Sequence, residues 1–153
     1  MSLKLGTTDY YEGALCRLED ARRLEDQQRW VAAVYLAGRA VEAMLRSLLW
    51  VKDRQQEIGH DLRDLLKRSR SLGMLDREDE EFDDHLEDVA RLWHNNLRYA
   101  GDGYFLRCLK QIKMDRGLPR NADPVKVNAQ KIIESCEIII SRGELVWNHS
   151  RRR

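Results

Sequence analysis

Apolar residues recur along most of the chain at alternating spacings of three and four, which is the repeat of one face of an α-helix. The most regular set is Trp30, Val34, Ala37, Val41, Met44, Leu48 and Val51. It predicts a long helix over about residues 29–53, with the kind of apolar stripe that packs in helical bundles. Small residues on this helix, among them Ala37 and Gly38, leave room for a close neighbour.

The same spacing predicts helices on both sides of this segment. The expected ranges are residues 7–28, 60–73, 76–101, 104–114 and 124–147. The fourth helix starts at Asp76 or Glu78 and ends between residues 98 and 101. Because no strand pattern or internal repeat is found, the expected fold is all-α: an antiparallel, up-and-down bundle of four long helices plus one or two short ones.

Length and composition agree with one helical domain over residues 1–153, with its core at about 8–147 and a basic tail at 148–153. Charged residues make up 35% of the 153 residues and apolar residues 42%. The longest apolar run, residues 30–37, has eight residues and is far too short to cross a membrane. The N-terminus has no apolar segment typical of a signal peptide, so a cytoplasmic protein with no membrane partner is expected.

The net charge of +1 gives no overall attraction to nucleic acid, but the charges are unevenly distributed. Nine acids lie between Asp76 and Asp88, and basic residues prevail from Arg91 to Arg120. The simplest interpretation is a solvated acidic start of a helix, followed by a solvated basic segment.

The three cysteines have no metal-ligand spacing. Cys16 and Cys136 fall on apolar helical stripes, which favours core packing for both. No metal site is expected.

The segment VARLWHNNLRY, residues 89–99, holds the main candidate site. On one helix, Trp93 would join the apolar stripe of Phe82, Leu86 and Val89, whereas Arg91, His94 and Arg98 would form a second stripe. Two guanidinium groups beside a histidine can bind phosphate, and the histidine can act as a general acid or base. The structural alternative is an ordinary surface ion pair between Glu87 and Arg91.

Other catalytic motifs are not found. The chain has no phosphate-binding GxxxxGK[ST] loop, GxGxxG, HExxH or nucleophile elbow, so no cofactor is expected. His60, next to Asp61 at a helix start, could be a ligand, but a capping or packing role is favoured.

Four segments together resemble the HEPN domain family. They are RWVAAVYLAGRAVEAMLRSLLW at 29–50, GHDLRDLL at 59–66, LWHNNLRYAGD at 92–102 and the apolar C-terminal helix. The resemblance implies an up-and-down helical bundle and a homodimer in which the ends of the fourth helices meet near the two-fold axis. It also implies nucleotide or RNA binding there, with a nucleotidyltransferase as a partner protein.

Ribonuclease members of that family carry an arginine followed, after four to six residues, by a histidine. Here only two residues separate Arg91 from His94, and no histidine follows Arg98 before His149. The residue with five between is Tyr104. This departure favours binding over cleavage, with the ligand-binding residues expected to be Arg91, His94, Asn95, Arg98 and Tyr99. The alternative is a metal-independent ribonuclease toxin that uses His94 with Arg91 or Arg98.

Overall fold

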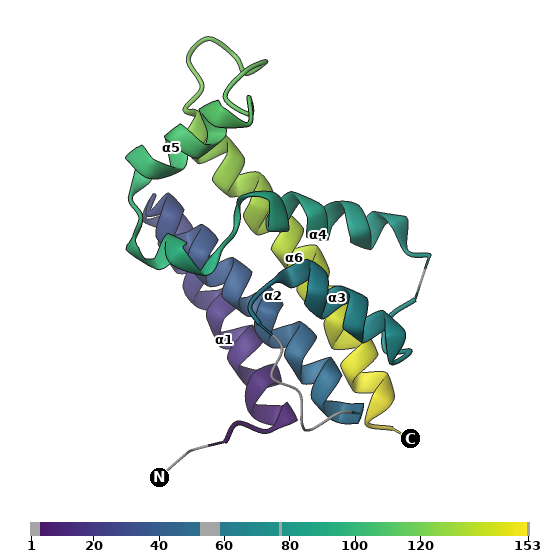
Figure 1. Ribbon diagram of the computed structural model, residues 1–153. Helices are drawn as coiled ribbons and strands as arrows, with labels where there is room; N and C mark the ends of the chain where they lie inside the picture. Colours follow the sequence, from purple (N-terminus) through teal and green to yellow (C-terminus); the bar gives the residue numbers. More distant parts are fainter. Residues whose placement is uncertain (1–3, 53–58, 77, 153) are drawn as a thin grey trace.

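The computed structural model describes residues 4–52, 59–76 and 78–152, and within these ranges it is all-α (Figure 1). Its helices are α1 Thr7–Asp26, α2 Trp30–Lys52, α3 Leu62–Ser71, α4 Glu80–Leu92, the short 3₁₀ helix η1 Asn95–Tyr99, α5 Asp102–Gln111 and α6 Pro124–Ser150. The all-α bundle expected from the sequence is therefore confirmed. No helix in the described ranges is long and apolar enough to cross a bilayer.

Helix α2 is the centre of the bundle and touches α1, α3, α5, α6 and η1. Its predicted stripe forms the core, since Val34, Ala37, Val41 and Met44 have no exposed surface. Helix α1 runs antiparallel to α2, and α6 runs beside α2 in the same direction (Figure 1). Helix α4 crosses over α6, and α5 lies at the end of the bundle away from both termini (Figure 1).

The helix ends follow local capping chemistry. The Asp61 carboxylate accepts the backbone N–H of Arg63 at 2.8 Å and so caps α3, while Gly73 follows that helix at a positive φ of 71°. Asp123 caps α6 ahead of Pro124. At α1 the N-cap is Gly6, directly before the helix start expected at residue 7.

The predicted end of the fourth helix is wrong. Helix α4 stops at Leu92, and both Trp93 (φ −80°, ψ 129°) and His94 (φ −148°, ψ 157°) are extended. The chain leaves the helix where the Trp93 indole lies against Gly38 of α2 and donates a 3.0 Å hydrogen bond from Nε1 to the Tyr35 carbonyl. Trp93 is in the core as expected, but Arg91, His94 and Arg98 do not share a helical face.

The acidic residues near α4 are not simply solvated, as the sequence had suggested. Asp79 and Glu81 both bind the guanidinium of Arg142 on α6. Asp83 and Glu87 bind arginines of α3, so the charges attach α4 to both of its neighbours.

Of the two cysteines expected in the core, one is buried and the other is exposed. Cys136 is fully buried, which confirms its predicted place. Cys16 is exposed on α1, so its prediction is wrong. It lies next to Leu15 at the edge of the apolar stripe, and that edge faces solvent.

Candidate functional site

The predicted site residues lie along the turn that follows α4. Arg91 is exposed on the last turn of that helix. His94 and Asn95 are half-buried, whereas Arg98 and Tyr99 are exposed on η1. Leu97 is 2% exposed, and its burial holds η1 against the core. The structure therefore places the predicted site residues in one short segment with two environments, an outer one at Arg98 and Tyr99 and an inner one at His94 and Asn95.

Tyr99 is the outstanding feature of the outer part, because 78% of its surface is exposed. The guanidinium carbon of Arg98 lies 4.6 Å from the centre of its ring. A cation at this distance is attracted to the face of the aromatic ring. Arg98 and Tyr99 thus combine a charge for phosphate with a planar surface for stacking.

Helix α5 adds a second aromatic side chain to the segment. Tyr104 Oη lies 3.4 Å from His94 Nε2, with the two rings edge to face. The pKa of Tyr104 is raised, first through its hydrogen bond with Cys108, so the phenol stays protonated at neutral pH. Arg107 lies 5.8 Å from the centre of the Tyr104 ring. Sequence reasoning did not select Tyr104 or Arg107, although their i, i+3 spacing on a short helix was visible.

The inner part of the segment faces a pocket of about 240 Å³ between the start of α3 and the end of α4. Its walls are His60, Asp61, Leu62, Arg63, Ala90, Trp93, His94 and Asn95. The pocket therefore brings together two histidines, His60 and His94, that are far apart in the sequence. His60 does not cap α3, since Asp61 does so.

His60 instead bonds to a buried carboxylate on α2. Glu42 is 3% exposed and lies 2.7 Å from His60 Nδ1. The same carboxylate accepts hydrogen bonds from Arg39 at 2.7 Å and Arg46 at 2.9 Å. A buried carboxylate is stable only when paired, and three cationic or titratable groups meet that requirement here. The sequence signal was the i, i+3 and i+4 spacing of Arg39, Glu42 and Arg46 within an otherwise apolar helix.

A family model named HEPN domain matches residues 7–146, which is most of the chain. The chain belongs to the HEPN domain family. Comparisons with curated proteins and with solved structures return no match. The resemblance inferred from the four sequence segments is thus confirmed.

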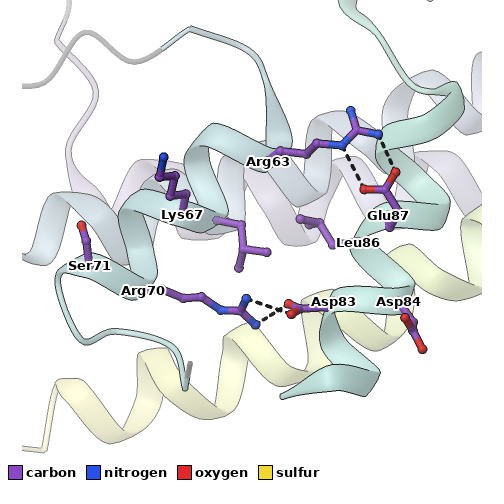
Figure 2. Close-up of a pocket in the computed structure, with 9 residues that line it drawn as sticks. Arg63, Lys67, Arg70, Ser71, Asp83, Asp84, Leu86 and Glu87 are labelled. Atoms are coloured by element: carbon purple, nitrogen blue, oxygen red, sulfur yellow. Dashed lines mark hydrogen bonds and ion pairs between the residues drawn. The ribbon is translucent and has the colours of Figure 1, made fainter. Parts of the chain in front are cut away.

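A larger groove of about 710 Å³ lies between α3 and α4 of this HEPN domain (Figure 2). Leu66 and Leu86 supply its apolar lining. Two arginine–carboxylate pairs cross it, Arg63 with Glu87 at 2.7 and 2.9 Å and Arg70 with Asp83 (Figure 2). The hydrogen bond from Arg63 is the first cause of the lowered pKa of Glu87, which keeps this carboxyl ionised. The partner of Glu87 is therefore Arg63 rather than the expected Arg91.

Arg63 lines both this groove and the smaller pocket of His60 and His94. Its pair with Glu87 joins the start of α3 to α4 beside that pocket. In the ranges that the structure describes, no three His, Cys, Asp or Glu side chains are grouped as a metal site would require.

Proposed function

We propose that this HEPN domain binds nucleotides or RNA through Arg98, Tyr99, Tyr104 and Arg107, which we call the Tyr99 surface. The observation that carries the proposal is the 78% exposure of Tyr99 beside the Arg98 guanidinium. Single-stranded nucleic acids bind to proteins by stacking bases on aromatic rings while cations hold the phosphates. An exposed tyrosine with a cation on its ring has both properties.

The charges around the Tyr99 surface support the same ligand. Exposed basic residues continue along α5 and the loop after it, at Lys110, Lys113, Arg116 and Arg120. Together with Arg98 and Arg107 they favour a polyanion over a neutral ligand. Since the whole chain carries a net charge of only +1, this attraction is local to one end of the bundle.

We also propose a homodimer in which two Tyr99 surfaces lie near the two-fold axis, and a nucleotidyltransferase as a partner protein. Membership of the HEPN family supports both. Light scattering on the purified chain tests the dimer. Co-purification with a nucleotidyltransferase encoded by a neighbouring gene tests the partner. A chain that is monomeric by light scattering would contradict the dimer, and a chain that co-purifies with no nucleotidyltransferase would contradict the partner.

Calorimetry with ATP and with a short RNA, on the protein alone and with its partner, tests the binding proposal. Wild type is expected to bind, and Arg98→Ala to bind more weakly because it loses a phosphate contact. Arg17→Ala is a matched control, because Arg17 is an exposed arginine of α1 paired with Asp20. No binding by the wild type in either condition would exclude the proposal.

A ribonuclease toxin is the second candidate function. The observation in its favour is that His94 contacts Tyr104 and shares a pocket with His60, which places two imidazoles in one site. Imidazoles are suited to proton transfer near neutral pH. Expression that stops cell growth, and a His94→Ala variant that restores it, would support this function. Intact cellular RNA and normal growth in both cases would exclude it.

A further inference from the structure

We propose that the pocket lined by His60 and His94 binds a phosphate group, and that Glu42 positions His60 within it. This inference deepens the proposed function, since the phosphate would belong to a nucleotide or to RNA at the Tyr99 surface. It assigns roles to His60 and Glu42, which lie far from the 89–99 segment in the sequence.

The contact with Glu42 determines which nitrogen of the His60 ring carries the proton. A carboxylate only accepts hydrogen bonds, so at 2.7 Å His60 Nδ1 carries the proton and donates it to Glu42. Arg39 Nη1 is also near Nδ1, but at 3.4 Å it is the looser neighbour. With Nδ1 occupied, Nε2 is the ring nitrogen left for a ligand. A carboxylate behind a histidine fixes the ring's orientation and tautomer in this way at many functional sites.

His60 and Glu42 differ in their exposure to solvent. Glu42 is buried, whereas 52% of the His60 side chain is exposed. A histidine that served only to attach the start of α3 to α2 would not need the side of its ring away from Glu42 to be accessible to a ligand. In this structure Nδ1 of His60 is bonded to Glu42, and the ring lines the same pocket as His94.

The side chains around the pocket include several that can bind an anion. His60, Arg63 and His94 line it from two separate segments. Arg63 donates hydrogen bonds in every state, and His60 donates from Nε2 as well as Nδ1 when its ring is the imidazolium, the form that a bound anion and the Glu42 carboxylate both favour. The one acid in the lining, Asp61, accepts the backbone N–H groups of Arg63 and Asp64. The charge of Glu42 is balanced by Arg39 and Arg46. Because both carboxylates already have partners, the remaining donors of the pocket are suited to an anion.

The volume of the pocket limits how much of a ligand it can hold. Pockets that enclose a whole small ligand hold roughly 300–1,000 Å³, and this one holds about 240 Å³. It therefore fits a phosphate and part of its sugar, with the base outside. Asn95 on the pocket wall and Tyr99 are the two ends of η1, which rises by roughly 2 Å per residue. A nucleotide chain can thus reach both the pocket and the Tyr99 ring.

Histidine NMR on the intact, ¹⁵N-labelled protein tests the inference. The described histidines are His60, His85, His94 and His149, and His60→Gln and His94→Gln assign the two that matter. We expect His60 to be protonated at Nδ1 in the free protein. Titration with inorganic phosphate, 5′-AMP and a single-stranded RNA is expected to shift His60 and His94 together. His149, at the far end of α6, is the control and is expected not to move.

Glu42→Gln tests the positioning role. The amide can present either its oxygen or its nitrogen to Nδ1, so we expect a mixture of His60 tautomers and about a tenfold loss of affinity for 5′-AMP, which is the effect of losing one charge-assisted hydrogen bond. His149→Gln is the matched variant and is expected to bind as the wild type does. If Glu42→Gln does not fold, the wild-type titration and His60→Gln decide the question.

The outcomes separate this inference from the function on which it rests. Shifts of both histidines with phosphate alone, or only with 5′-AMP or RNA, support it and identify the ligand as free or nucleotide-borne phosphate. RNA that perturbs Tyr99 but leaves His60 unmoved overturns this inference and leaves the proposed function standing. No binding of any probe overturns both.

Discussion

The indole of Trp93 lies against the bare backbone of Gly38. A Cβ atom built on Gly38 would approach Trp93 Cδ1 to 2.1 Å. This contact lets the indole reach the Tyr35 carbonyl, and it draws the chain out of α4 directly before His94. The position of the candidate site thus depends on the absence of one methyl group in the core.

Gly38→Ala is therefore expected to destabilise the fold and displace Trp93. Overpacking of this kind costs roughly 1–3 kcal/mol, which exceeds the gain of about 1 kcal/mol or less from placing alanine in a helix. Urea unfolding measures the loss, and faster hydrogen exchange at the Trp93 indole N–H reports the lost bond to Tyr35. Gly13→Ala is the matched control, because Gly13 is a helical glycine of α1 with no atom within 4 Å of the new Cβ. That variant is expected to gain about 0.5–1 kcal/mol, and equal behaviour of the two variants would contradict the account.

The Arg63–Glu87 pair is expected to stabilise the protein in a pH-dependent way. Because the pKa of Glu87 is lowered in the folded state, the contribution is present above the ordinary glutamate value of 4.5 and is lost as the pH falls through the folded pKa. Both side chains are about half exposed, so about 0.2–1 kcal/mol is expected at pH 7. The free energies of unfolding of wild type and Glu87→Gln, measured from pH 7 to below the ordinary glutamate pKa, give this contribution. In an Arg63→Gln background the pH-dependent difference should shrink, and an unchanged difference would contradict the pairing.

Thiol labelling is expected to show different native-state reactivity for Cys16 and Cys136. Cys16 is exposed and should react with a disulfide reagent in the native state. Cys136 is fully buried, and burial raises the pKa of its thiol, so it should react only after unfolding. Mass spectrometry of the labelled peptides identifies each site, and Cys16→Ser should remove the fastest phase. Native labelling of Cys136 would contradict its place in the core.

The helices could be predicted because their apolar faces follow the repeat of three and four residues. The stripe of α2 from Trp30 to Leu48 is buried as the spacing indicates. The caps Asp61 and Asp123 were not predicted, although each caps its helix through one local side chain. For these elements the sequence contains the physical cause of the structure.

The end of α4 could not be predicted in this way. Trp93 continues the apolar spacing of Phe82, Leu86 and Val89, so the pattern stays helical although the backbone does not. The deciding contacts are to Gly38 and Tyr35, more than fifty residues earlier. A periodic pattern identifies which residues are buried, but not which backbone conformation buries them.

The inner pocket was missed for a related reason. His60 pairs with Glu42, eighteen residues away on another helix, and meets His94 only through the packing of α3 against α4. The spacing of Arg39, Glu42 and Arg46 indicates a charged cluster on α2, but not which partner it holds. Tertiary contacts supply that information.

The central claim is that the Tyr99 surface binds RNA and does not cut it. The most direct measurement mixes a labelled single-stranded RNA with the purified protein, following complex formation by fluorescence anisotropy and RNA length on a gel. The account predicts a complex with intact RNA that weakens by roughly 1–3 kcal/mol in Tyr99→Ala, the usual value of one stacked base. The absence of a complex, or cleavage that His94→Ala abolishes, would contradict it.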